Sequence, residues 1–204
     1  MKESQSESVK ENGKPKVGIL AVQGDYEAHG KMLERLGVTY RFVVRPVELE
    51  DLDGLILPGG ESSTMLKFLE AEGLRTAIEQ FARHGGAVFG TCAGVILLAR
   101  EVMNPAQESL GLLDLAVRRN AYGRQLSSHV TQSTSKLKGE PLEMVFIRAP
   151  IIEDAGPNVE VLAEHDGHPV LVRQGRILAA TFHPELTSDT TVHQAFLKLI
   201  PNGA

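Results

Sequence analysis

Cysteine is almost absent from this chain, and basic residues are too few to dominate its charge. The single cysteine, Cys92, cannot form an internal disulfide. The 21 lysines and arginines are scattered among 26 aspartates and glutamates, which gives a net charge of −5. A protein that binds nucleic acid by neutralising phosphates needs the opposite balance, so we expect no nucleic-acid partner.

Long apolar runs are also missing. The longest uncharged run, 85–99, is too short to span a bilayer and is interrupted by glycines and polar residues, so we expect no membrane-spanning helix. Residues 1–14 are rich in Ser, Glu and Lys and have no hydrophobic period. They lack the apolar core of a secretory signal and the apolar surface that would offset their ordering entropy. We therefore expect a disordered polar tail and a cytoplasmic protein.

A length of 204 residues suits one substantial core, and we expect one domain over 15–201. Its first half alternates short apolar runs, such as KVGILAV and GLILPGG, with helical patterns near 25–36 and 62–84, the second broken near Gly73. Closely spaced strand patterns follow Leu110, and a last helix is expected near 190–199. The layout predicts a three-layer α/β/α domain with a mostly parallel central sheet and added antiparallel strands in the second half.

The sharpest local signal is the segment GTCAG at 90–94, between an apolar strand pattern and an apolar helical pattern. It has the form of a nucleophile elbow, a tight strand-to-helix turn that needs small flanking residues and presents its central side chain in an open site. The free N–H groups of the following helix favour thiolate over thiol. An arbitrary free cysteine is more often a small buried residue, but glycines on both sides at such a junction favour a reactive Cys92.

A thiolate needs a partner for proton transfer, and the candidate is His183, at the end of the strand pattern RILAATF. Pro184 favours an extended backbone at His183, and alternate residues of an extended segment point to the same side. Glu185 could therefore orient the imidazole, which gives the arrangement of nucleophile, base and orienting group. Other histidines, His193 among them, are interpreted as surface or internally bonded residues. None has metal-ligand spacing with Cys92, so we expect no metal site.

The segment LPGGES at 57–62 ends a strand pattern and opens a helical one. Paired glycines let the backbone approach a substrate, and their N–H groups can face a developing oxyanion. We expect the amides of Gly60 and Ala93 to form the oxyanion hole. The alternative is an ordinary turn with Ser62 as the helix N-cap, and both interpretations can hold together. Neither glycine-rich phosphate-binding motif, GxxxxGK[ST] or GxGxxG, is present.

These segments together resemble a known family. GTCAG, PGGES and FHPE are similar to the class I, triad-type glutamine amidotransferase domain, over nearly all of 16–199. Six segments in order narrow the resemblance to the glutaminase subunits of pyridoxal 5′-phosphate synthase. They are AVQGDYEAH at 21–29, PGGESST at 58–64, GTCAG at 90–94, RRNAYGRQ at 118–125, FIRAP at 146–150 and FHPELT at 182–187.

The resemblance implies a division of labour between two proteins. The glutaminase hydrolyses L-glutamine to L-glutamate and ammonia through a thioester on Cys92, with His183 and Glu185 completing the triad. The ammonia passes to a synthase subunit that builds pyridoxal 5′-phosphate, in vitamin B6 biosynthesis, from a pentose phosphate and a triose phosphate. The family assembles as a synthase oligomer decorated by glutaminase subunits. The resemblance implies no cofactor in this chain.

The resemblance also implies roles for residues outside the triad. Those expected to bind glutamine are Gly60, Glu61, Ser62, Arg119, Ile147 and Arg148. Those expected to face the synthase are Gln23, Gly24 and His29. The chain departs from the family where an acidic residue usually stands at the place of Arg118 and a Ser-Phe pair at the place of Ala121 and Tyr122. These departures affect the expected partner contacts and leave the triad intact.

Two other functions stay open at this point. The chain could be the glutaminase subunit of another amidotransferase, such as the histidine-pathway enzyme, although RRNAYGRQ and FIRAP argue against it. It could also be a noncatalytic regulatory module, which the presence of Cys92, His183 and Glu185 disfavours. A cysteine peptidase on a related fold is a weaker option, because nothing in the sequence indicates a groove for an extended peptide.

Overall fold

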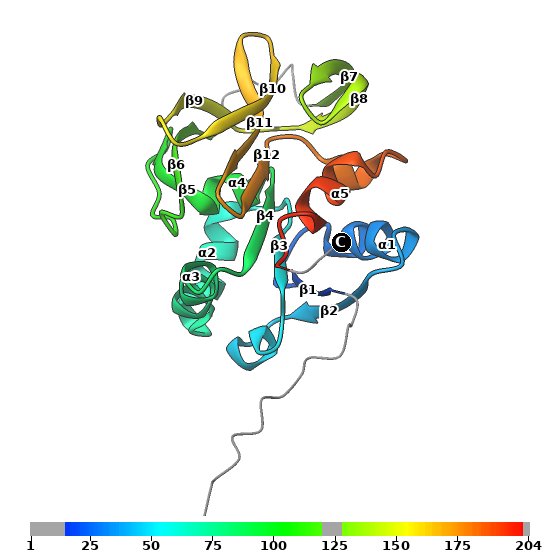
Figure 1. The fold of residues 1–204 in the computed structure, drawn as a ribbon. Coiled ribbons are helices and arrows are strands. Elements are labelled where there is room, and N and C mark those ends of the chain that lie inside the picture. Colours follow the sequence, from blue (N-terminus) through cyan, green and yellow to red (C-terminus); the bar gives the residue numbers. More distant parts are fainter. Residues whose placement is uncertain (1–14, 120–127, 202–204) are drawn as a thin grey trace, which may run out of the picture.

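The structure is a computed structural model that describes residues 15–119 and 128–201 (Figure 1). The expected tail at 1–14 therefore lies outside the described residues, as do Ala121 and Tyr122. Within the described ranges, no helix is both long and apolar enough to cross a membrane.

A nine-stranded sheet forms the centre of the described structure, in the order β2-β1-β3-β4-β12-β11-β10-β7-β8. Its parallel half contains β1 (Lys16–Leu20), β2 (Thr39–Val43), β3 (Gly54–Leu57), β4 (Ala87–Thr91) and β12 (Ile177–Ala180). Its antiparallel half contains β7 (Ser128–Ser135), β8 (Lys138–Ile147), β10 (Glu160–His165) and β11 (His168–Gln174). The expected α/β class with an antiparallel second half is confirmed, and four parallel pairings are matched by four antiparallel ones.

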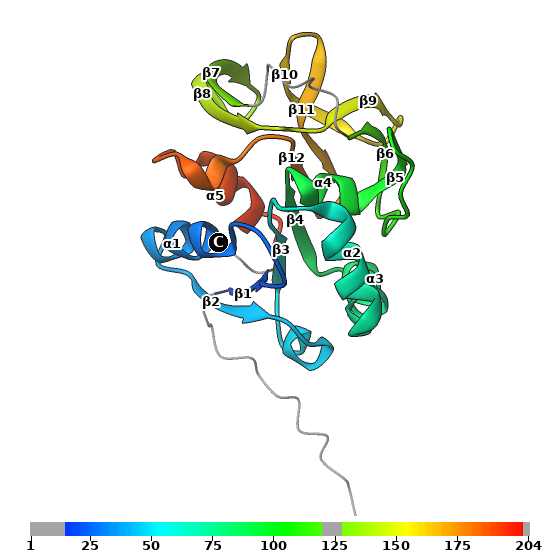
Figure 2. The same ribbon diagram turned by 180° about the vertical axis from the view of Figure 1, so that it is seen from behind.

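Helices cover both faces of the parallel half of this sheet (Figures 1 and 2). On one face lie α1 (Tyr26–Arg35) and α5 (Thr191–Leu197). On the other lie α2 (Ser62–Ala71), α3 (Leu74–Arg83) and α4 (Ala93–Leu98). The break expected near Gly73 is confirmed, because this glycine separates α2 from α3 with a φ of 71°. Two short 3₁₀ helices are η1 (Pro46–Leu49) and η2 (Pro184–Leu186).

A second, three-stranded sheet packs beside α4, in the order β5-β6-β9. Its strands are β5 (Ala99–Met103), β6 (Leu113–Arg118) and β9 (Ile151–Ala155). The sequence did not predict β5, β7 or β9. The sequence of β7, SHVTQSTS, has no alternating apolar residues that would indicate a strand. β5 begins directly at the end of α4, and no turn residues separate the two elements.

The apolar runs of β3 and β4 follow from their central position. Every residue of both strands is buried, because helices cover the sheet on its two sides. The core on the α2 side includes Met65 and Leu69, and the core on the α5 side includes Phe89 and Phe196.

Four neighbouring parallel strands, β1, β3, β4 and β12, end at the same edge of the sheet. The segments that leave them carry the candidate residues Gln23, Gly60, Cys92 and His183. Parallel strands place their carboxyl ends together, and in open α/β sheets ligands bind in the crevice at this edge. Residues far apart in the sequence are therefore brought to one place.

Candidate active site

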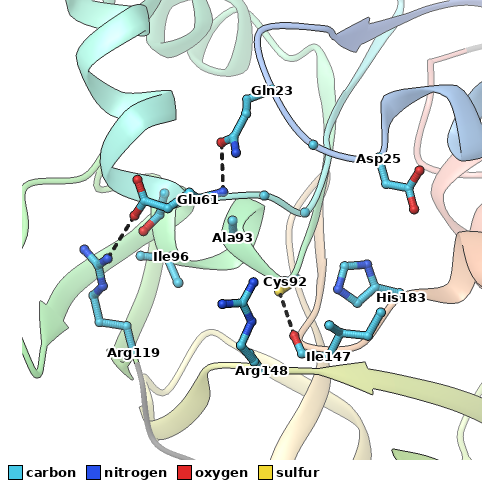
Figure 3. Close-up of a pocket in the computed structure, with 14 residues that line it drawn as sticks. Gln23, Asp25, Glu61, Cys92, Ala93, Ile96, Arg119, Ile147, Arg148 and His183 are labelled. Carbon is cyan, nitrogen blue, oxygen red and sulfur yellow. Dashed lines mark hydrogen bonds and ion pairs between the residues drawn. The ribbon is translucent and has the colours of Figure 1, made fainter. Parts of the chain in front are cut away.

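A cavity of about 440 Å³ opens at this edge (Figure 3). It is lined by all the predicted site residues except Glu185 and His29. The full lining is Gln23, Gly24, Asp25, Gly59, Gly60, Glu61, Ser62, Cys92, Ala93, Ile96, Arg119, Ile147, Arg148 and His183.

Cys92 occupies a strained turn between β4 and α4. Its φ of 48° and ψ of −103° are rare for a residue with a side chain, and its N–H donates to the Ala180 carbonyl at 2.9 Å. A Cβ atom at Gly94 would lie 2.1 Å from the Leu57 carbonyl oxygen, so position 94 must be glycine. The structure therefore contains the sharp strand-to-helix turn that GTCAG predicts, with Cys92 at the wall of the cavity.

His183 is held between Cys92 and Glu185. Its Nδ1 atom lies 2.7 Å from Glu185 Oε1, and each of the two residues is only 6% exposed. From the sequence, we expected an extended segment to place Glu185 on the same side as His183. This was wrong, because Pro184 and Glu185 lie in the 3₁₀ turn η2. The carboxylate nevertheless reaches the imidazole of His183.

The electrostatics of the pair favour an imidazolium. Burial alone would lower the pKa of His183, but hydrogen bonds to Cys92 and Glu185, with the charges of both groups, raise that pKa to about 10. Burial would raise the pKa of Glu185, but His29 and His183 beside it hold that pKa below its ordinary value.

Because Nδ1 of His183 faces Glu185, Nε2 is the nitrogen left for Cys92, and Figure 3 shows the imidazole beside the sulfur. The Cys92 Sγ atom also lies 3.8 Å from the carbonyl oxygen of Ile147. A sulfur anion beside an imidazolium can attack a carbonyl carbon and then protonate a departing amine.

The loop at 59–61 forms one wall of the cavity, and its Gly59 packs against the imidazole of His183. The Glu61 N–H donates to Gln23 Oε1 at 2.8 Å, and a Cβ atom at Gly24 would lie 1.7 Å from the Gly59 carbonyl oxygen. The segment after β1 therefore packs directly on this loop. Gly60 and Ala93 both line the cavity that contains Cys92, and their part in an oxyanion hole stays a prediction.

Glu61, and not Ser62, caps helix α2. Its carboxylate accepts hydrogen bonds from the Ser63 N–H at 3.1 Å and the Thr64 N–H at 2.7 Å. The Thr64 hydroxyl also donates to this carboxylate, and the hydrogen bonds from the hydroxyl and the two amides lower the pKa of Glu61 to about 2. Ser62 is the first helical residue, and its hydroxyl donates to Gln107 Oε1 at 3.0 Å. The N-cap expected at Ser62 is thus corrected, because a carboxylate one residue earlier reaches two free amides.

A polar cluster connects Arg119 to the start of α2. Its Nη2 atom lies 3.2 Å from Glu61 Oε1, and its Nη1 atom donates to Ser63 Oγ at 2.8 Å and to Gln107 Oε1. The sequence did not single out Gln107, because no motif marks the segment after β5. Arg148 lines the cavity from the end of β8, with a φ of 45° and an exposed side chain. The cavity thus presents two anionic side chains, Asp25 and Glu61, and two cationic ones, Arg119 and Arg148, which can bind the α-ammonium and α-carboxylate groups of a free amino acid.

His29 does not lie on the surface, which corrects its expected place at a partner interface. It is 0% exposed, and its Nε2 atom is 3.5 Å from Glu185 Oε2. The sequence placed it correctly in a helix but could not show which helical face turns inward. Gly24 is exposed and Gln23 is partly buried at the cavity, so their role toward a partner stays a prediction. Among the described residues, no group of three or more His, Cys, Asp and Glu side chains is placed to hold a metal ion.

Comparison with known proteins agrees with this geometry. The SNO glutamine amidotransferase family matches residues 19–201. The chain is 56% identical over 188 residues to a Koribacter versatilis protein named pyridoxal 5′-phosphate synthase subunit PdxT, covering 92% of this chain and 97% of the relative. A Thermotoga maritima protein of the same name is 49% identical over 186 residues, covering 91% and 99%.

A solved structure described as a glutamine amidotransferase superposes with a TM-score of 0.86 at 44% identity, covering 92% of this chain and 99% of that one. The more distant PurLQS structure from Thermotoga maritima, 18% identical with a TM-score of 0.69, shares the fold. Fold, site geometry and sequence identity over nearly the whole chain lead to one conclusion: this protein belongs to the SNO glutamine amidotransferase family.

Proposed function

We propose that this chain hydrolyses L-glutamine to L-glutamate and ammonia through a thioester on Cys92. It supplies the ammonia to the synthase subunit that makes pyridoxal 5′-phosphate. The observation that carries the proposal is the buried 2.7 Å contact between His183 Nδ1 and Glu185 Oε1, which leaves the other imidazole nitrogen for Cys92 at the cavity wall. The names of the relatives support the choice of pathway.

The reaction proceeds in two halves on the same residues. The Cys92 thiolate attacks the side-chain amide carbon of glutamine, and the amides of Gly60 and Ala93 stabilise the oxyanion. The imidazolium of His183 gives its proton to the nitrogen as the carbon–nitrogen bond breaks, so ammonia leaves and a γ-glutamyl thioester remains. Neutral His183 then takes a proton from water, which attacks the thioester and releases glutamate, regenerating the thiolate and the imidazolium.

Glutamine is oriented by the charges at the opposite end of the cavity. The carboxylate of Glu61, with its pKa near 2, stays ionised at neutral pH and accepts from the α-ammonium group. Arg119 and Arg148 donate to the α-carboxylate, for which a guanidinium is well shaped. Ser62 and Ile147 complete the walls.

The product ammonia is used by a second protein, in the cytoplasm. The relatives are named as subunits, and this chain matches more than nine-tenths of their length. The synthase docks over the exposed segment around Gln23 and Gly24, which packs on the oxyanion loop. Docking there would order that loop, so the isolated chain is expected to be slow.

The test uses the chain with and without its synthase, and with glutamine or ammonium as the nitrogen source. Cys92→Ala should abolish glutamine-dependent formation of pyridoxal 5′-phosphate, because the covalent route is lost. Ammonium-dependent formation by the synthase should be unchanged, which serves as the internal control. Glutamine hydrolysis by Cys92→Ala would overturn the nucleophile, and equal wild-type turnover with and without the synthase would overturn the coupling.

A further inference from the structure

A second imidazole contacts the triad carboxylate on its far oxygen. Glu185 Oε1 is hydrogen-bonded to Nδ1 of His183, and Oε2 lies 3.5 Å from Nε2 of His29. The same Nε2 is 3.2 Å from Thr91 Oγ1, next to the nucleophile in the sequence. His29 is on α1, on the opposite side of the carboxylate from the cavity, so it touches neither Cys92 nor the substrate space.

A third imidazole contacts the other ring nitrogen of His29. Nδ1 of His29 lies 3.0 Å from Nε2 of His193 on α5. Nε2 of His29 lies beside the carboxylate of Glu185, which as an anion can only accept, so the tautomer with the hydrogen on Nε2 is favoured. In that tautomer Nδ1 of His29 accepts from Nε2 of His193, and the Nε2 hydrogen of His29 lies between Thr91 and Glu185.

Burial keeps both of these imidazoles neutral. Desolvation lowers the pKa of His29 despite the nearby charge of Glu185, and it lowers the pKa of His193, next to His29, to about 3. The groups that act on His29 are Glu185 on η2, His193 on α5, His183 and Asp25, which precedes α1. The ring of Phe89 on β4 packs edge-on against both imidazoles, which restricts their rotation.

From this geometry we propose that His29 is a positioning residue for the glutaminase reaction, with His193 supporting its tautomer. The proposal rests on the proposed function. His29 holds the second oxygen of Glu185 so that the first oxygen keeps His183 aligned with Cys92. Oε2 makes no hydrogen bond among the described residues, so the imidazole of His29, 3.5 Å away, is the polar group that stabilises this buried anionic oxygen. Without His29 the oxygen would lose that stabilisation. The carboxylate would then rotate or take up a proton, and in either case it would hold the imidazolium less firmly.

The test compares His29→Leu, which removes the donor, with His29→Gln, whose amide restores one. His84→Gln on the exposed end of α3 is the matched control. Each is assayed as the complex with the synthase. His29→Leu should lower kcat roughly tenfold with KM nearly unchanged, because a buried anionic oxygen loses the polar group that faces it. His29→Gln should recover part of the loss, and His84→Gln should match the wild type.

A second readout separates positioning from general damage to the fold. The rate of Cys92 alkylation by iodoacetamide, measured against pH, reports the thiolate–imidazolium pair without glutamine. In His29→Leu this rate should fall at neutral pH and its rise should move to higher pH, because a poorly held Glu185 supports the imidazolium less. His193→Gln, which replaces the partner and leaves His29 in place, should shift the profile in the same direction by less.

The outcomes divide clearly. An unchanged kcat and an unchanged alkylation profile in His29→Leu would overturn the positioning role, as would an effect on KM alone. If His29→Leu does not fold, the alkylation profiles of His29→Gln and His193→Gln decide, and wild-type profiles in both would overturn it. If the wild type does not hydrolyse glutamine while the alkylation profiles still shift, the proposed function fails and the positioning role stands.

Discussion

The side-chain oxygen of Gln23 accepts a hydrogen bond from the backbone N–H of Glu61 at 2.8 Å, which joins the segment after β1 to the loop after β3. The two residues are 38 positions apart, and the bond crosses the rim of the cavity. The loop that carries the expected oxyanion donor is thus held by a residue that we also expect to face the synthase. We therefore expect a movement of the first segment to displace the second.

Removing this bond should slow the chemistry. Gln23→Ala should lower kcat by roughly fivefold, because a net contribution of about 1 kcal/mol from one hydrogen bond would no longer hold the oxyanion loop. Turnover of glutamine by the complex with the synthase is the measurement. Gln132→Ala, at an exposed position on β7, is the control. Wild-type kcat in Gln23→Ala would show that the loop does not depend on this contact.

A side chain at position 24 should displace the same loop. Gly24 has a φ of 94°, and its added Cβ would lie 1.7 Å from the Gly59 carbonyl oxygen. Gly167 has a φ of 78° with no atom within 4 Å, so Gly167→Ala carries the backbone strain alone. Gly167→Ala should lower the free energy of unfolding by about 1 kcal/mol. Gly24→Ala should lower it more, and we expect only Gly24→Ala to lose activity. Equal melting temperatures would contradict this.

Arg119 should affect substrate binding more than turnover. Arg119→Lys keeps the charge but cannot contact Glu61, Ser63 and Gln107 together. We expect KM for glutamine to rise about tenfold or more, since a hydrogen bond between charged groups is worth about 1.5–3 kcal/mol. Arg118→Lys, one residue earlier in a surface ion pair with Glu153, is the matched control and should leave KM unchanged. A fall in kcat alone would place Arg119 outside the binding site.

Stability should depend on pH through His183. Its pKa is raised from 6.5 to about 10 in the folded chain, so folding favours the charged form. The stabilisation is fully present below pH 6.5 and is lost as the pH rises toward 10. The difference in melting temperature between the wild type and His183→Gln should therefore shrink between these two values. A difference that stays constant over this interval would mean that His183 is not held as an imidazolium.

The sequence by itself determined the chemistry and most of the strand and helix order. GTCAG specifies a turn that only small neighbouring residues permit. The apolar runs of β3 and β4 specify strands that are buried on both faces. Both signals can be recognised in the sequence because they are local properties of the chain. The choice of His183 and Glu185 was also local, because the two residues are neighbours in one segment.

Only the tertiary structure decided how the segments meet. β7 has no apolar period, so its strand exists through its pairing with β8, which no local signal reports. The depth of His29 depends on how α1 packs on the sheet, and its contact with His193 joins positions 164 residues apart. Gln107 meets Arg119 and Ser62 for the same reason. Burial and long-range contact come from packing several elements together, and a pattern along one segment carries no record of its distant neighbours.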